Sequence, residues 1–269
     1  MARSLSATQS AAAATPRSPG TRWRGLAVPA LSLLALVALW QLAAMIAGDP
    51  RLMPSPSRVL AKILADSANG ELPWNLAITL TRVTISFGIA MTVGVAIGIV
   101  MGRVRLADEL GQPWLVFFLN LPALVTIILC YIWIGLIEAA ALLAVALNKI
   151  PNVVVTVREG ARALDAGLME MAEVFQVPRG RRLRHVVLPQ LYPYLIGAAR
   201  SGLALIWKIV LVVELLGRSN GVGFQLGVYF QLFDVAGILA YAISFIVVVQ
   251  LIEWGIVQPL ERRASRWRR

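Results

Sequence analysis

Charged and amide side chains stand inside two stretches of this sequence that are otherwise apolar, at about 137–157 and 194–216. Four of them, together with one tryptophan, are candidates for lining a path through a membrane: Asn148, Lys149, Lys208 and Glu214, with Trp207. A charge at the centre of a membrane helix costs about 2.5–3.5 kcal/mol on insertion scales, so such side chains should face protein or water. Two interpretations stay open. Either the lysines favour an anionic solute, or they pair with Glu214, Glu138 or each other and hold helices together.

A polar segment of about 30 residues, 158–190, separates these two stretches. Its first part, Asp165 to Phe175, has apolar residues at the i, i+3, i+4, i+7 spacing of an amphipathic helix, namely Leu168, Met171, Ala172 and Phe175. Pro178 breaks this helix, and a second short, arginine-rich helix should end at Leu188-Pro189. The segment could dock on a partner protein, or it could lie on anionic lipid.

The composition indicates a chain whose solvent is mostly lipid. Of 269 residues, 58% are hydrophobic and 14% are charged, whereas soluble domains carry about 25% charged residues. The net charge of +11 would suggest nucleic acid in a soluble protein, but the basic residues here sit beside apolar stretches, so we expect no nucleic-acid partner. The single cysteine and single histidine, Cys130 and His185, provide no disulfide framework, no metal site and no catalytic site.

Six stretches reach the ~20 apolar residues that a membrane helix needs, which predicts an all-α polytopic membrane protein with six transmembrane helices. They lie at about 26–47, 76–102, 113–134, 137–157, 194–216 and 236–257. The transmembrane domain is thus 26–257, between a disordered basic N-terminus at 1–25 and a basic tail at 258–269. If the N-terminus is inside, the inside segments carry 17 Lys and Arg and the outside segments carry four. Both termini and segment 158–190 should therefore be cytoplasmic.

The second stretch carries glycines on one helix face, with Gly94, Gly98 and Gly102 four residues apart and Gly88 before them. A face without side chains lets another helix approach closely. Tight packing is the favoured interpretation, and a moving helix pair near a pathway is the alternative.

The polar segment resembles the EAA loop of permease subunits of binding-protein-dependent ABC importers. That pattern runs Glu-Ala-Ala, three residues, Gly, and a distal Leu-Pro, and it is similar to Glu170-Met171-Ala172, Gln176 and Leu188-Pro189 here. Met171 stands where Ala is usual. Gln176 stands where Gly is usual, so it must make the turn at greater backbone cost. Met53 to Ser57 and Ile206-Trp207 resemble the nitrate/sulfonate/taurine branch, and the likeness covers roughly 52–263.

The resemblance implies a type I ABC importer permease (MetI-like) fold in the bacterial inner membrane. It implies a second copy of the chain in a homodimer, a cytoplasmic ATPase subunit under each copy, a solute-binding protein outside, and lipid around the helices. It assigns coupling to the ATPase to seven residues: Glu170, Met171, Ala172, Phe175, Gln176, Leu188 and Pro189.

The chain has no G-x-x-x-x-G-K-[ST] sequence, so we expect it to bind no cofactor and to be no enzyme, with ATP used by the partner subunit. The implied solute is small and anionic, such as nitrate, a sulfonate or taurine. The alternative is a secondary transporter or channel that works without ATP.

Overall fold

The structure, a computed structural model, describes residues 20–259, and over that range it contains helices and short connections but no strand. The predicted all-α class is therefore confirmed. The chain divides into two units, Met1–Pro56 and Ser57–Arg269.

The first unit contains α1 (Gly20–Ala47), whose apolar side chains are exposed from residue 30 onward, as expected for contact with lipid. This helix covers the predicted first span. The helix begins at Gly20, six residues before the predicted span, so residues 20–25 belong to it, while 1–19 and the tail at 260–269 lie outside the described residues. Once a helix has formed, each further residue adds a hydrogen bond at little cost, so a stable apolar helix extends into its polar flank.

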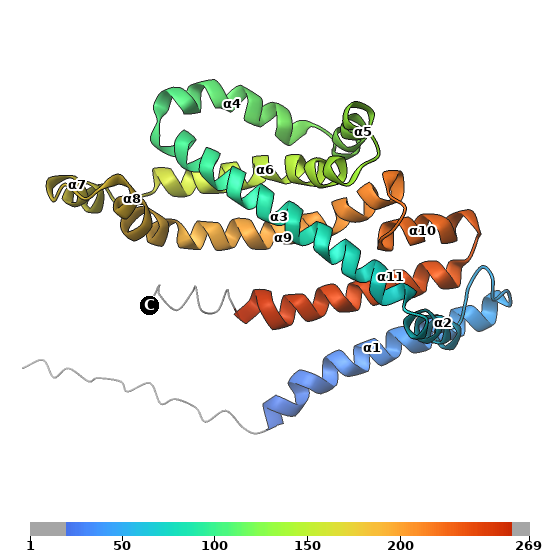
Figure 1. Ribbon diagram of the computed structural model, residues 1–269. Helices are drawn as coiled ribbons and strands as arrows, with labels where there is room; N and C mark the ends of the chain where they lie inside the picture. Colours follow the sequence, from blue (N-terminus) through green and yellow to red (C-terminus); the bar gives the residue numbers. More distant parts are fainter. Residues whose placement is uncertain (1–19, 260–269) are drawn as a thin grey trace, which may run out of the picture. The chain divides into compact units, whose positions relative to one another are not determined.

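The helices that follow are shown in Figure 1. In chain order they are α2 (Pro56–Ala68), α3 (Glu71–Arg103), α4 (Arg105–Asn120), α5 (Ala123–Ile134), α6 (Glu138–Arg162), α7 (Ala166–Val174), α8 (Arg179–Arg182), the π-helical turn η1 (Leu183–Val187), α9 (Leu188–Gly217), α10 (Val222–Gln231), α11 (Val235–Ile252) and the π-helical turn η2 (Glu253–Val257).

Among the described residues, five helices are long and apolar enough to cross a membrane, and the count rises to six if α4 and α5 are one broken span. The prediction of a single helix at 113–134 is wrong, since α4 and α5 meet at 99°. Leu121, between them, has extended backbone angles, φ −72° and ψ 122°. The following residue, Pro122, explains the break, because a proline disfavours helical angles in the residue before it.

The core of the second unit forms where α3 packs along α6 and α6 packs along α9. The glycine face of α3 makes the first of these contacts possible. A Cβ atom added at Gly94 or Gly98 would overlap Val153 or Val157 of α6, and one added at Gly102 would overlap Ala161. The close-packing interpretation of the glycines is therefore confirmed for these three. It is wrong for Gly88, where a Cβ atom would meet nothing within 4 Å.

The short helix α2 is tied to α10 by the nearly buried carboxylate of Asp66, which is 3% exposed. Tyr229 donates a hydrogen bond to it at 3.3 Å, and Lys62 lies 3.2 Å away. Burial, with Asp66 nearby, raises the pKa of Tyr229 to about 12, so the phenol remains a donor at neutral pH.

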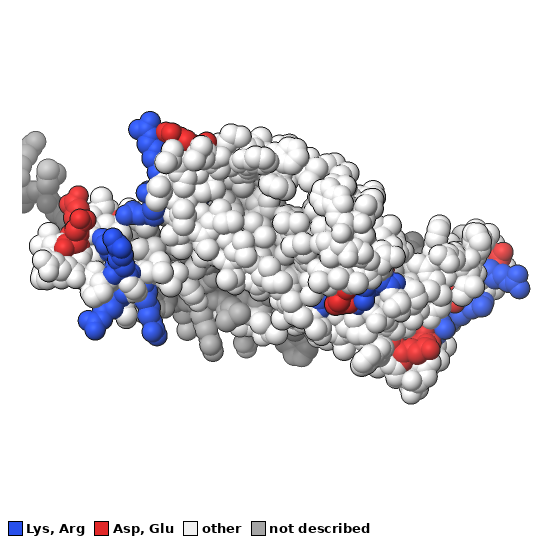
Figure 2. All heavy atoms as spheres, turned by 45° about the horizontal axis from the view of Figure 1, so that its top comes forward, with Lys and Arg blue, Asp and Glu red and all other residues white. Residues whose placement is uncertain are grey.

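Charged side chains are distributed unevenly over the surface. Figure 2 shows Lys, Arg, Asp and Glu gathered toward the ends of the helices, with little charge on the wide visible face between them. An uncharged band bounded by charged ends is the arrangement expected of helices that cross a bilayer.

Candidate functional site

The polar segment folds as two helical pieces around a sharp turn. Helix α7 begins at the N-cap residue Asp165, whose carboxylate accepts a hydrogen bond from the Leu168 amide at 3.0 Å. This caps one of the free amides of the first turn. The helix is held to the bundle by Ala172, which is 2% exposed, and by Met169, which packs in a small cluster with Val187 and Leu191.

The predicted apolar face of α7 points outward rather than inward. Of the four residues at helical spacing only Ala172 is buried, and Met171 and Phe175 are 50% and 75% exposed. Val174, at the end of the helix, is 78% exposed and enlarges this apolar tip. Glu170 is also exposed. The helix thus presents apolar side chains and a carboxylate to whatever lies beyond the bundle.

The turn after α7 falls at Gln176, which has φ 49°. This is left-handed backbone, which glycine adopts freely and which costs other residues about 1–2 kcal/mol. The backbone closes the turn with a hydrogen bond from the Val177 amide to the Ala172 carbonyl at 2.9 Å.

The prediction that the second short helix ends at Leu188-Pro189 is wrong. Helix α8, the turn η1 and α9 form one uninterrupted helical segment from Arg179 to Gly217. The π-helical turn explains how the chain passes Pro189. Its hydrogen bonds are shifted by one residue, as in the bond from the Leu188 amide to the Leu183 carbonyl, and the helix continues through Pro189.

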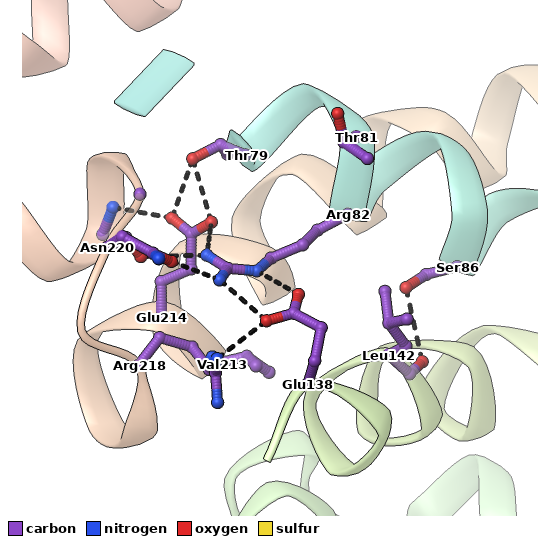
Figure 3. A network of polar contacts seen from close by, with 12 residues as sticks. Thr79, Thr81, Arg82, Ser86, Glu138, Leu142, Val213, Glu214, Arg218 and Asn220 are labelled. Atoms are coloured by element: carbon purple, nitrogen blue, oxygen red, sulfur yellow. Dashed lines mark hydrogen bonds and ion pairs between the residues drawn. The ribbon is translucent and has the colours of Figure 1, made fainter. Parts of the chain in front are cut away.

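At the other end of the bundle a buried ionic network joins α3, α6, α9 and the loop after α9 (Figure 3). Arg82 of α3, which is 3% exposed, donates to Glu214 of α9 at 2.7 Å and to Glu138 of α6 at 2.6 Å. It also donates to the carbonyl of Asn220 at 2.9 Å. Arg218 lies 2.8 Å from Glu138, so two arginines face two glutamates. The network is electrically balanced.

Glu214 also supports the start of α10. Its fully buried carboxylate accepts a hydrogen bond from the Gly223 amide at 2.8 Å and from the Thr79 hydroxyl at 2.9 Å. The Val222 amide donates in turn to Thr79, and the Gly221 amide donates to Asn75. The free amides at the start of a buried helix need such acceptors, and a carboxylate is favoured there by the helix dipole.

The five predicted path-lining residues therefore separate into three places. Glu214 belongs to the structural network, and the expectation that the lysines pair with Glu214 or Glu138 is wrong, because those carboxylates are held by arginines. Lys149 of α6 is 1% exposed and lies against Gly202 of α9, where a Cβ atom would overlap its side chain. Asn148 beside it is half-buried and donates to the Ala144 carbonyl within its own helix.

Trp207 and Lys208 come together at a cleft of about 440 Å³ between α9, α10 and α11. Trp207 is 8% exposed and packs edge-on against Phe245 of α11, with ring centroids 5.9 Å apart. Lys208 is exposed and borders the same cleft, as do Gln250 and Glu253. The cleft can hold a small molecule against an aromatic wall with charged groups at its edge.

Arg82, at the centre of the ionic network, was not among the residues predicted to have a role. A lone arginine inside an apolar stretch needs an acidic partner, and the apolar stretches contain few acids. That rule would have singled out Arg82, Glu138 and Glu214 as groups that need partners, without saying which of them pair. It would also have singled out Glu253, which borders the cleft.

A protein-family model described as "binding-protein-dependent transport system inner membrane component" matches residues 94–265. Among curated relatives, the putative aliphatic sulfonates transport permease protein SsuC of Escherichia coli (strain K12) is 30% identical, over 93% of this chain and 95% of its own length. SsuC of Bacillus subtilis (strain 168) is 29% identical over 96% of this chain and 93% of its own length. The taurine transport system permease protein TauC of Escherichia coli is 25% identical over 93% and 92%.

Similar solved structures include an amino acid ABC transporter with histidines, with a TM-score of 0.57 at 20% identity over 70% of this chain and 92% of the other. They also include the native crystal form of the inward-facing methionine transporter MetNI, with a TM-score of 0.56 at 19% identity over 71% and 94%. These likenesses show a shared fold.

Proposed function

This chain belongs to the family of binding-protein-dependent transport system inner membrane components. We propose that it works as the permease subunit of an ABC importer. It forms the path of a small solute with an anionic group, and it receives energy from a separate ATPase through segment 158–190. The chain is a multi-pass inner-membrane protein.

One observation carries the coupling proposal. The second part of the polar segment, from Arg179 onward, runs without a helix break into α9, which carries Trp207 and Lys208. A force applied to the turn at Gln176 passes directly into the helix that borders the cleft, since packed helices move as rigid units. The exposed tip of α7, with Phe175 and Glu170, provides a contact surface for the ATPase subunit.

The proposed assembly has two copies of this chain, one ATPase subunit under each copy, a solute-binding protein at the outer face and lipid around the apolar band. Both termini and α7 face the cytoplasm, in keeping with the excess of Lys and Arg in segments 1–25, 103–112, 158–190 and 258–269. The chain binds no cofactor of its own, and ATP is used by the partner subunit.

The solute is a small molecule with an anionic group, of the kind named for the relatives, which include permeases for aliphatic sulfonates, taurine and nitrate. The cation that supports this choice is Lys208, at the cleft between α9 and α11.

The test of coupling is Glu170→Arg, measured as recovery of the ATPase subunit when the full-length permease is purified. Glu170 is exposed and has no side-chain hydrogen bond or ion pair within the described part of the chain, so the variant should insert and fold normally. We expect it to lose the ATPase. Glu109→Arg is the matched control, because Glu109 is an exposed glutamate on α4 whose partner is Arg105.

Recovery of the ATPase with Glu170→Arg at the wild-type yield would refute the coupling proposal. Solute uptake by the purified permease alone in proteoliposomes, without ATPase or ATP, would support the ATP-independent alternative instead.

A further inference from the structure

The cleft between α9, α10, α11 and η2 has the size and lining of a small-molecule site. Its volume of about 440 Å³ lies within the roughly 300–1,000 Å³ that ligand pockets occupy. Most of its lining is apolar, and the polar exceptions are Lys208, Gln250 and Glu253.

The two charged groups at the cleft, Lys208 and Glu253, have no side-chain partner among residues 20–259. Neither the ammonium of Lys208 nor the carboxylate of Glu253 has a hydrogen bond or an ion pair with any residue that the structure describes. Arg82, Glu138 and Glu214, in contrast, are all paired. An ionised group at membrane depth is costly unless protein, water or a ligand compensates it. One cation and one anion that face the same cleft without meeting each other thus call for an occupant.

The two charges are separated along the cleft. Lys208 follows Trp207, whose ring packs on Phe245. Glu253 comes eight residues after Phe245, which is about 12 Å along a helix, and the reach of the two side chains shortens the gap between the charges. Glu253 is also the first residue of the π-helical turn η2. Such turns change the direction of side chains within a helix and are frequent at functional sites.

We propose that this cleft is a binding site for a small zwitterion, such as an aminosulfonate or an amino acid. This proposal rests on the proposed function. The acid group of the zwitterion faces Lys208, its ammonium group faces Glu253, and its short apolar body lies against Trp207 and Phe245. A simple anion such as nitrate would compensate Lys208 but would leave Glu253 without a partner, and it would have no apolar body to cover the aromatic wall. A zwitterion satisfies both charges at once.

The test compares two solutes that differ by one charge. Taurine and propane-1-sulfonate share a sulfonate and a two-carbon spacer, and end in an ammonium or a methyl group respectively. Equilibrium binding of radiolabelled taurine is measured on the full-length permease in nanodiscs, with propane-1-sulfonate and nitrate as competitors. The variants are Lys208→Met and Glu253→Gln, with Glu109→Gln as the matched control outside the cleft.

We expect the wild type to favour taurine over propane-1-sulfonate by about tenfold, which corresponds to one good charged contact of about 1.4 kcal/mol. Lys208→Met should weaken both sulfonates. Glu253→Gln should weaken taurine alone and so remove the preference, and Glu109→Gln should change neither. Lys208→Arg keeps the cation, so it should retain binding if Lys208→Met proves unstable.

Equal or tighter binding of propane-1-sulfonate by the wild type would overturn the proposal, as would an unchanged preference in Glu253→Gln, or no binding of either sulfonate. If a second copy of the chain covers the cleft instead, the two cleft variants would lower the dimer fraction without changing the preference, which also overturns it. Binding is read on the permease alone, whereas the proposed function is judged by ATPase association and ATP-driven uptake, so the two failures are distinguishable.

Discussion

Arg82→Met should strongly destabilise the protein, because Arg82 pairs with two carboxylates, one of them fully buried. The guanidinium lies 2.7 Å from Glu214, which is fully buried, and 2.6 Å from Glu138, whose side chain is 47% exposed. Methionine keeps the approximate length of the side chain but removes its charge and its hydrogen bonds. The variant leaves Glu214 as a buried anion without a cation.

Removing one partner of a buried ion pair costs about 3–5 kcal/mol. For a protein of roughly this size, 1 kcal/mol moves the unfolding midpoint by about 2–4 °C. Arg82→Met should therefore lower the midpoint by about 6–20 °C. Adding Glu214→Gln should raise the midpoint again, because the double variant has no unpaired charge at this position. The glutamine oxygen can still accept from the Gly223 amide, and Glu138 keeps Arg218 at 2.8 Å.

The chain contains its own reporter for this experiment. Cys130 is the only cysteine, and it is buried in the same core as Tyr131 and Ile206. A fluorogenic thiol reagent will react with it when the core opens on heating. Glu109→Gln, on the exposed surface of α4, is the control and should move the midpoint by less than about 2 °C. A double variant that unfolds at or below the midpoint of Arg82→Met would refute the charge-balance reasoning.

Two further substitutions test the helix seam and the turn. Gly98→Val places a side chain where a Cβ atom would already lie 2.8 Å from Val157, so it should cost about 1–3 kcal/mol of stability. Gly88→Val, which meets open space, is its control, and equal midpoints in the thiol assay would contradict the seam. Gln176→Gly should relieve the left-handed backbone at φ 49° and raise the midpoint by roughly 2–8 °C while the ATPase still co-purifies. An unchanged or lower midpoint would show that the turn carries no strain.

The positions of the helices could be predicted from the sequence because apolar length and periodicity are local properties. Pro122 marks a possible helix break in the sequence. The apolar pattern continues on both sides of it, however, and the angle of the bend depends on tertiary packing, so the bend could not be predicted. The run of helix through Pro189 was missed for a related reason. A proline ends a regular helix, yet the π-helical turn before it shifts the hydrogen bonds, and no local pattern announces that shift.

The sequence could predict that charged groups pair, but not which residues form the pairs. The sequence indicates that ionised groups in membrane helices need partners, but it does not say which helices face each other. The glycine face of α3 gave one such contact, since Gly94, Gly98 and Gly102 require a close neighbour. The neighbour proved to be α6, and that contact brings Arg82 within reach of Glu138. The interpretation in which Lys149 and Lys208 pair with these glutamates is wrong, because the arginines occupy the glutamates.

The separation of paired from unpaired charges has a mechanical consequence. The network of Arg82, Glu138 and Glu214 fastens α9 to α3, α6 and α10 at the end of the bundle away from α7, whereas the other end of α9 continues into the polar segment. Lys208 lies only six residues from the fastened Glu214, about 9 Å along the helix. A displacement applied at α7 should thus tilt α9 about its fastened end and change the width of the cleft beside Lys208. Loosening that end with Arg82→Met should weaken transport more than the double variant does, even at temperatures where both remain folded.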